Sequence, residues 1–326
     1  MELVTNKKLY LVSGRISRPL SEAIADEMGE ELGEPNLAEF ANGEIHCRFS
    51  ESIRGSDVFI IQTHCNVPGT TINDSLMEQL IMVDAARRAS AKRITVVCPH
   101  YGYARQDRKA SGREPITAKL VANLFKAAGA TRLVGVDLHS GQIQGFFDGP
   151  VDHLTAMPVL IERLNSLDGD LTIVSPDAGR VKVAERYAMQ LHADLAIVHK
   201  RRSHSEFNTV EAKEVVGAVD GKVCILVDDM IDTAGTICAA ADQLSERGAA
   251  KVIAATTHGI FSGPAMERLT ASSIEKVIVT DTVPLPEGTD PDFVEVLTVA
   301  PLIARAIGAV FADASVSEIF GGNNLA

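Results

Sequence analysis

The sequence predicts an α/β protein of two similar units, each a parallel sheet flanked by helices. Short apolar runs rich in β-branched residues alternate with helical patterns along the 326 residues, as expected for parallel sheets with helices on both faces. Several of these runs stop at polar clusters, which is where such sheets bind ligands. The strand-then-proline outline of 93–100 returns at 172–177, and 134–137 parallels 226–229. We therefore expect two copies of one fold.

In the first half of the chain, the first helix should be capped by Ser17. Four apolar residues from Leu20 to Leu32 recur at four-residue spacing behind it, and serine is a preferred residue at this position. Two more helices are expected at 75–89 and 117–128. Strands are expected at 9–13, 45–49, 58–62, 94–98 and 133–136.

In the second half, the same alternation begins again. Strands are expected at 171–174, 195–198, 223–227, 252–256 and 277–279. Helices are expected at 156–164, 181–191, 264–269 and 302–307, and one more should open after residue 236. We place the boundary near Asp152, which gives domains at 1–152 and 153–326.

Composition excludes several function classes. A formal net charge of −12 argues against general nucleic-acid binding. The five cysteines are scattered and form no Cys-x-x-Cys pair, which indicates reduced thiols rather than a zinc site or a disulfide framework. The N-terminus lacks a signal-peptide pattern, and no apolar run is long enough to cross a bilayer. We expect a cytoplasmic protein that binds neither nucleic acid nor membrane.

The stretch 223–241 carries the strongest chemical signal. Its apolar start predicts a buried strand that ends at two adjacent acids, Asp228 and Asp229. A small-residue turn then opens a helix, whose first amides can bind phosphate oxygens. Gly235 would let the backbone approach a ligand closely. Because carboxylates suit sugar hydroxyls or a metal, this loop describes a ribose 5-phosphate site; a strand followed by an aspartate-capped helix is the alternative.

A basic loop follows the strand expected at 94–98. It contains Arg105, Arg108, Lys109 and Arg113, a concentration of positive charge in an acidic chain. Arginine forks onto phosphate oxygens, and the loop lies at the carboxyl end of a strand, where ligands bind. A solvated surface loop is the alternative that charge alone leaves open.

His139 and Asp177 each follow a strand, one in each half of the chain. A histidine and an aspartate from separate loops could hold a hydrated Mg²⁺, which takes few protein ligands and keeps waters and substrate phosphates. A histidine with only a structural hydrogen bond is the alternative.

Lys200, Arg201 and Arg202 follow another strand end. Consecutive cations suit the stabilisation of a phosphoryl group in transfer. The polar stretch 203–208 is interpreted as a mobile loop that closes over the site and excludes water. An exposed basic hairpin is the alternative.

Taken together, these stretches resemble the bacterial ribose-phosphate pyrophosphokinases, also called phosphoribosyl pyrophosphate synthetases, from about Phe40 to Ala265. The segment VDDMIDTAGT alone is similar to the ribose-phosphate signature of the wider phosphoribosyltransferase superfamily. The pieces specific to synthetases include FANGE, YGYARQDRK, PITAKLVANL, DLHSGQIQGFFDGPVDHL, SPDAG and the Lys-Arg-Arg run. The resemblance implies two tandem phosphoribosyltransferase-like domains.

The resemblance also implies a reaction and its residues. The β,γ-diphosphoryl group of ATP passes to the anomeric hydroxyl of ribose 5-phosphate, with AMP as the second product and Mg²⁺ as the cofactor. Ribose 5-phosphate is assigned to Asp228, Asp229, Asp232, Thr233, Ala234, Gly235, Thr236 and Arg202. ATP is assigned to Arg105 and Gln106 and, from a neighbouring subunit of a hexamer, to Phe40, Asn42, Gly43 and Glu44. The metal is assigned to His139 and Asp177, and the transferring group to Lys200 and Arg202.

Two other functions stay open. A phosphoribosyltransferase would consume the activated sugar, but the ATP-side residues argue against it. A non-catalytic relative that regulates a synthetase is expected to lose a catalytic position, and no loss is visible. Two departures from the family pattern bear on loop closure and the metal site: Ser203 stands where bacterial relatives often have proline, and Arg180 stands where the family has glycine.

Overall fold

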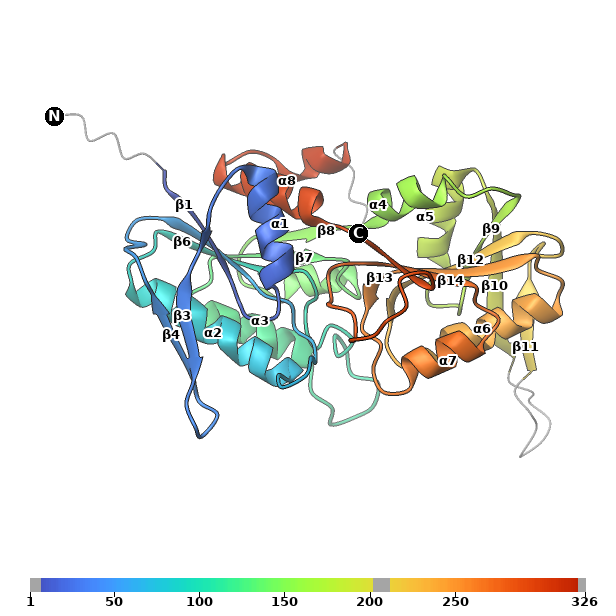
Figure 1. Ribbon diagram of the computed structural model, residues 1–326, viewed down its shortest axis with the longest axis horizontal. Coiled ribbons are helices and arrows are strands. Elements are labelled where there is room, and N and C mark those ends of the chain that lie inside the picture. The colour runs from blue at the N-terminus through green and yellow to red at the C-terminus, as the bar shows by residue number, and fades with distance from the viewer. Residues whose placement is uncertain (1–6, 202–211, 322–326) are drawn as a thin grey trace. The chain divides into compact units, whose positions relative to one another are not determined.

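The computed structural model of the chain describes residues 7–201 and 212–321 (Figure 1). The chain forms two compact units. Unit 1 comprises Met1–Thr155, Thr282–Pro284 and Thr298–Ala326, and unit 2 comprises Ala156–Asp281 and Leu285–Leu297. The chain thus leaves unit 1 close to the boundary expected at Asp152. It differs from the expected ranges at its C-terminal end, which belongs to unit 1.

Unit 1 is built on a six-stranded sheet in which every neighbouring pair is parallel. The strand order is β2-β1-β5-β6-β7-β8. The bounds are β1 Leu9–Ser13, β2 Leu32–Gly33, β5 Asp57–Ile61, β6 Arg93–Cys98, β7 Arg132–Val136 and β8 Val151–Leu154. Because the strands run in parallel, the loops after β5, β6 and β7 all leave the sheet on the same side, at the carboxyl ends of the strands.

Helices cover both faces of this sheet (Figure 1). The helices α2 (Ile72–Arg88) and α3 (Thr117–Ala128) lie on one face, where Val83 and Phe125 are packed in one core with Val58 of β5. The helices α1 (Arg18–Met28) and α8 (Ala300–Phe311) lie on the other face and contact each other. Two short 3₁₀ helices, η1 (Gly141–Gly145) and η2 (Val316–Phe320), complete the unit. Among the described residues, no helix has both the length and the apolar character needed to cross a membrane.

The prediction that Ser17 caps the first helix is wrong. The helix is also shorter than expected. Ser17 precedes α1, but its side chain makes no capping bond. Its hydroxyl instead accepts a hydrogen bond from the Thr63 amide at 2.6 Å. The helix ends at Met28 because Gly29 adopts a left-handed conformation with φ 65°, which is the usual C-terminal stop. Leu32, the last residue of the expected helical pattern, therefore lies outside the helix and belongs to β2.

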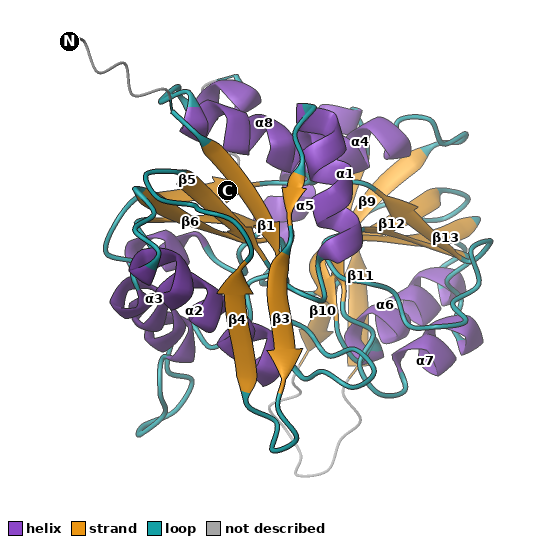
Figure 2. Cartoon of the chain, turned by 60° about the vertical axis from the view of Figure 1, so that its left-hand side comes forward, coloured by secondary structure: helices purple, strands orange, loops and turns teal. Residues whose placement is uncertain are grey.

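An antiparallel hairpin of β3 (Pro35–Glu39) and β4 (Ile45–Phe49) extends from unit 1 (Figure 2). The strand β4 matches the expectation, whereas β3 was not expected. The registry pairs Glu39 with Ile45, so the turn at 40–44 forms the tip of the hairpin.

Unit 2 is built on a seven-stranded sheet with the order β11-β10-β9-β12-β13-β14-β15. Its pairs are parallel except at one edge, where β10 and β11 run antiparallel. The bounds are β9 Leu171–Ser175, β10 Asp194–Arg201, β11 Ala212–Val216, β12 Val223–Ile231, β13 Lys251–Gly259, β14 Lys276–Thr280 and β15 Val294–Leu297. The expected parallel sheet is therefore present, with one antiparallel pair added at this edge.

Alternate residues of β12 face two different helical layers. Ile225 and Val227 share a core with α4 (Met157–Leu164) and α5 (Val181–Leu191). Cys224 and Leu226 share a core with α6 (Gly235–Glu246) and α7 (Ala265–Ala271). A strand buried on both faces is continuously apolar, which explains the run that identifies it in the sequence.

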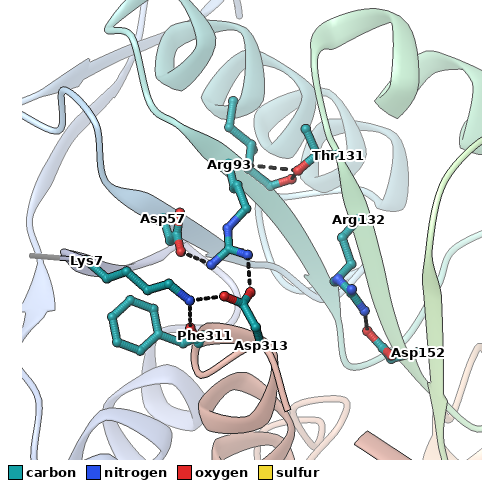
Figure 3. A network of polar contacts seen from close by, with 9 residues as sticks. Lys7, Asp57, Arg93, Thr131, Arg132, Asp152, Phe311 and Asp313 are labelled. Carbon is teal, nitrogen blue, oxygen red and sulfur yellow. Dashed lines mark hydrogen bonds and ion pairs between the residues drawn. The ribbon is translucent and has the colours of Figure 1, made fainter. Parts of the chain in front are cut away.

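The segment after α8 is held to the N-terminal part of unit 1 by a charge network (Figure 3). The Asp313 carboxylate lies 2.5 Å from a terminal nitrogen of Arg93 and also pairs with Lys7. Arg93 pairs in turn with Asp57, which starts β5. Lys7 also donates to the carbonyl of Phe311 at 2.9 Å. These contacts join the beginning of the sheet to the end of the chain within one unit.

Candidate functional site

In unit 2, the two adjacent acids lie inside β12 rather than beyond its end. The strand was expected to stop at Val227, but its ladder with β13 continues and pairs Asp228 with Thr256 and Ile231 with Gly259. The expected strand end is therefore wrong by several residues. The physical reason is that β13 is also longer than expected, and ladder bonds use backbone groups that every residue here carries.

Arg180 contacts both acids. Its Nε lies 3.1 Å from Asp228 Oδ1, and one terminal nitrogen lies 2.7 Å from Asp229 Oδ2. The Asp229 amide also donates to Asp228 Oδ1 at 2.8 Å. Burial raises the pKa of Asp228 to about 8; the hydrogen bond and charge of Asp229 act in the same direction, while Arg180 opposes them. One cation thus compensates two neighbouring carboxyl groups.

In the sequence, Arg180 is notable only because it stands where the family has glycine, close to the expected metal ligand Asp177. Nothing in the sequence signals its pairing with Asp228 and Asp229, because the contact depends on β9 and β12 being neighbours in the sheet. The side chains of Arg180 and Asp229 are 17% and 10% exposed, so the pair is largely shielded from solvent, and its charges interact more strongly than on the surface.

The turn between β12 and α6 and the first two residues of α6 contain residues 232–236, which are among those assigned to the sugar phosphate. Ala234 is the N-cap of α6 and has a left-handed conformation with φ 61°. Its side chain has no acceptor and makes no capping bond to the first amides of the helix. The turn is fixed from outside, since the Thr233 carbonyl accepts Arg268 at 3.0 Å and the Asp232 carbonyl accepts the Ser262 amide at 2.9 Å. Such amides, together with the helix dipole, suit a phosphate group.

The unusual backbone conformation lies one residue before the glycine singled out in the sequence. Gly235 has an ordinary helical φ, and a Cβ there would come no nearer than 3.7 Å to Arg268. The local fold therefore does not require glycine at 235. Close approach of a ligand to Gly235 stays a prediction.

Asp177 lies in an exposed turn between β9 and α5. The Ser175 hydroxyl donates to the Asp177 carbonyl at 2.6 Å, and the Gly179 amide donates to Asp177 Oδ1 at 2.7 Å. The turn leads directly into Arg180. Unit 2 therefore brings the Asp177 turn and the acid pair of β12 together through one side chain.

In unit 1, the loops after β6 and β7 are joined to each other. Gln106 is held at the start of α3, where its side-chain oxygen accepts the Thr117 hydroxyl at 2.5 Å. The next residue, Asp107, is buried and accepts the Ser140 hydroxyl at 2.5 Å and the Gln142 amide at 2.8 Å. Arg105 is exposed. Asp107 thus positions the loop that carries Arg105 and Gln106 against the loop that carries His139.

Two residues of these loops escaped sequence reasoning. Asp107 is a lone acid in a basic loop, and this contrast is the only feature of the sequence that could have identified it. His153 accepts the Leu138 amide at 2.9 Å beside the half-buried His139, and burial lowers its pKa. Within residues 7–201 and 212–321, no three His, Cys, Asp or Glu side chains form a group able to hold a metal.

The hairpin tip exposes Phe40, whose side chain is 56% exposed. This exposure rules out that Phe40 packs into the core of its own unit. The Phe40 amide donates to the Glu44 carbonyl at 2.8 Å, and Gly43 donates back to the Phe40 carbonyl at 2.8 Å. Gly43 has φ 87°, a conformation that favours glycine. Asn42 accepts the Glu44 amide through its side chain at 3.2 Å.

The cations expected to act in catalysis are only partly within the described structure. Lys200 lies in β10 and pairs in register with Lys213 of β11. Arg202 and the polar loop 203–208 lie outside the described residues.

Comparisons with known proteins point to one family at both ends of the chain. The N-terminal domain of ribose phosphate pyrophosphokinase matches residues 9–129, and the phosphoribosyl synthetase-associated domain matches residues 211–321. The chain is 54% identical to the ribose-phosphate pyrophosphokinase of Streptomyces avermitilis over 316 residues, 96% of each chain. It is 52% identical to that of Bifidobacterium longum, over 97% of this chain and 93% of the relative.

A solved structure gives the same result. The phosphoribosylpyrophosphate synthetase of Mycobacterium smegmatis matches with a TM-score of 0.88 and 50% identity, over 94% of this chain and 100% of that one.

Proposed function

The chain belongs to the ribose-phosphate pyrophosphokinase family, and from this premise we propose that it makes 5-phosphoribosyl 1-pyrophosphate from ATP and ribose 5-phosphate. The anomeric hydroxyl oxygen of the sugar forms a bond to the β-phosphorus of ATP. The bond between this phosphorus and the oxygen bridging to the α-phosphate breaks, AMP leaves, and the hydroxyl proton passes to solvent. The product feeds nucleotide biosynthesis.

One observation carries this proposal. A single chain holds a sugar-phosphate turn after β12 and a second, basic loop after β6. A phosphoribosyltransferase needs only the first, because its substrate is already activated. A diphosphoryl transfer needs both, since two polyanionic substrates must be held in line with little covalent help from the protein.

Ribose 5-phosphate binds to the β12–α6 connection in this proposal. The first amides of α6, which the Ala234 side chain does not cap, receive the 5-phosphate. The carboxyl groups of Asp228 and Asp229 receive the sugar hydroxyls, for which they must be released in part by Arg180. The full set of proposed contacts is Asp228, Asp229, Asp232, Thr233, Ala234, Gly235, Thr236 and Arg202.

ATP binds to Arg105 and Gln106 in the loop after β6. The exposed ring of Phe40 offers a stacking surface for a purine, and its place at a hairpin tip suits contact with a neighbouring subunit. Asn42, Gly43 and Glu44 would reach the same nucleotide. We therefore propose a homohexamer with ATP sites shared between subunits.

Lys200 and Arg202 are proposed to stabilise the charge that develops on the transferring group. Lys200 is the last residue but one of β10, and Arg202 follows this strand directly in the sequence. Cations fixed before the reaction act most strongly in the transition state. No nucleophilic side chain is required, because the sugar hydroxyl attacks directly.

Mg²⁺ is proposed as the cofactor, held by His139 and Asp177. The donor set fits this ion: Asp177 is exposed, and only one of its carboxylate oxygens has a protein partner in its own turn. An ion that keeps several waters and takes substrate phosphates as ligands needs few protein groups. When bound, it would neutralise phosphate charge. A cytoplasmic location completes the proposal, since all five cysteines are free thiols.

The experiment is a nucleotide assay. Protein, Mg²⁺, ATP and ribose 5-phosphate are mixed, and the nucleotide products are separated by chromatography, with omission of the sugar as the control. The proposal predicts AMP that depends on ribose 5-phosphate. ADP as the nucleotide product would mean transfer of a single phosphoryl group and would overturn it.

A further inference from the structure

His64 is a fully buried histidine that the proposed reaction does not use. It follows β5, and its ring stacks on Phe125 with a centroid distance of 5.9 Å. The Tyr101 ring forms a T-shaped pair with the same ring, with a centroid distance of 6.2 Å. Burial lowers the pKa of His64 to about 4, so the ring is neutral at physiological pH. A neutral imidazole has one donor and one acceptor nitrogen.

The surrounding hydrogen bonds decide which nitrogen carries the proton. The Gln79 amide nitrogen donates to the carbonyls of Ile60 at 2.9 Å and Val97 at 3.3 Å, and this fixes the Gln79 side-chain oxygen toward His64. That oxygen lies 2.8 Å from Nε2, and it can only accept. Nε2 therefore carries the proton, and Nδ1 has a free lone pair.

This lone pair accepts the backbone amide of Gly102 at 3.0 Å. Gly102 belongs to the loop after β6 that contains Arg105 and Gln106. The contact is close, because a Cβ at Gly102 would lie 2.8 Å from the Cβ of His64. Tyr103 follows with φ 63°, and its carbonyl accepts the Gln106 amide at 2.9 Å. The path from Gly102 to Gln106 is thus a single tight turn that starts at the histidine.

A second contact joins the same two loops through the backbone. The His64 amide donates to the His100 carbonyl at 3.1 Å, and the ring of His100 donates through Nδ1 to the His64 carbonyl at 2.7 Å. His100 fixes the start of the loop, and the His64 ring holds Gly102. Removal of the ring acceptor would leave a buried amide without its partner.

We propose that His64 is a positioning residue for the nucleotide loop: its Nε2–H tautomer holds the Gly102 amide and so sets the course of the backbone that carries Arg105 and Gln106. This inference rests on the proposed function, because it assigns His64 to the binding of ATP rather than of ribose 5-phosphate.

Two substitutions separate the two ring nitrogens. In His64→Asn, the side-chain oxygen can take the place of Nδ1 and accept Gly102. In His64→Gln, the amide nitrogen can take the place of Nε2 and donate to Gln79, but Gly102 loses its acceptor. We expect His64→Gln to raise KM for ATP on the order of tenfold, the scale of one unsatisfied buried amide, with KM for ribose 5-phosphate unchanged. His64→Asn should stay within about threefold of the wild type for both substrates, well short of the loss of one buried hydrogen bond.

The matched control is His192→Gln, which removes an exposed histidine at the end of α5 and should change neither KM. A purely structural role for His64 would affect both variants alike and both substrates alike, and that result would overturn the proposal. An inactive wild-type protein would instead count against the proposed function itself.

A measurement on the wild-type protein guards against variants that fail to fold. Amide hydrogen exchange followed by mass spectrometry, with fragmentation that resolves single residues, reads the Gly102 amide directly. We expect it to exchange at least tenfold more slowly than the amides of the exposed residues Arg108, Lys109, Gly112 and Arg113. Equally fast exchange at Gly102 would show that the histidine does not hold it.

Discussion

At the scale of single residues, Arg180 changes the meaning of the two acids in β12. The sequence alone assigns Asp228 and Asp229 to the sugar hydroxyls. In that interpretation the two acids are neighbouring negative charges for which the protein provides no cation. The structure instead supplies a cation for both, at 3.1 and 2.7 Å. A ligand that uses these acids must therefore compete with Arg180, so this residue controls how readily the sugar hydroxyls bind.

The first prediction concerns the stability that Arg180 provides. Arg180→Ala leaves two largely buried acids without their cation, so we expect the free energy of unfolding to fall by about 1–3 kcal/mol. Urea unfolding at neutral pH measures this loss. Arg305→Ala removes an exposed arginine from α8 and is the control. Equal, small losses in both variants would show that the Arg180 contacts contribute nothing.

The second prediction is a pH dependence due to His64. Its pKa falls from 6.5 to about 4 on folding, so the unfolded chain binds more protons between these values. The stability contributed by the neutral ring is therefore present above pH 6.5 and is lost as the pH falls toward 4. Between pH 7.5 and 5, the wild type should lose about 2 kcal/mol more than His64→Asn.

Urea unfolding of both proteins at the two pH values tests this second prediction. The comparison with His64→Asn cancels the other titrating groups, which both proteins share. An identical pH dependence in the two proteins would mean that His64 is not neutral in the fold.

At the scale of elements, the sequence located the interior of both sheets and missed their edges. The helices at 117–128 and 181–191 have the expected bounds, and so does the strand β1. The strands that were not expected are β2, β3, β8, β11 and β15. Four of them are the edges of the two large sheets, and β3 belongs to the hairpin.

There is a physical reason for this division. A central strand of a parallel sheet is buried on both faces, so its sequence is a continuous apolar run, as in 224–227. An edge strand is half exposed, and the edge strand Val151–Leu154 has two polar residues between two apolar ones, over only four positions. So short a sequence cannot be distinguished from that of a loop.

The third prediction belongs to the end of β10. Lys200→Ala and Arg202→Ala should each lower kcat on the order of 10²-fold or more, with much smaller changes in KM, because the lost contacts strengthen only in the transition state. Arg201→Ala is the matched control, since it removes the same charge between them. Steady-state kinetics with each substrate varied in turn gives the split. A normal kcat in both test variants would remove these residues from the catalytic set.

At the scale of the whole molecule, the echo between the two halves predicted two α/β units, but not the return of the chain. The segment Thr298–Ala326 belongs to unit 1, where α8 contacts α1 and Asp313 pairs with Arg93 (Figure 3). Helix α8 has an apolar pattern that either unit could bury. Its destination depends on complementary contacts distant in sequence, which periodicity does not reveal.

The fourth prediction concerns assembly. One inactive variant carries Phe40→Ala with Glu44→Ala at the hairpin tip, and another carries Arg105→Ala in the loop after β6. If each ATP site combines the tip of one subunit with the loop of another, co-refolded mixtures contain some sites with two intact halves. Activity should therefore return in part. Mixtures that stay inactive, despite proven exchange of subunits, would place each ATP site within one chain.

The most direct test of the central claim follows both phosphorus atoms that ATP loses. Two parallel reactions contain ATP labelled with ³²P at the β position or at the γ position, together with ribose 5-phosphate and Mg²⁺. Transfer of the diphosphoryl group as one unit predicts that both labels appear in the sugar product in equal yield, while AMP carries neither. A γ label in the sugar product with the β label left in ADP would contradict the account.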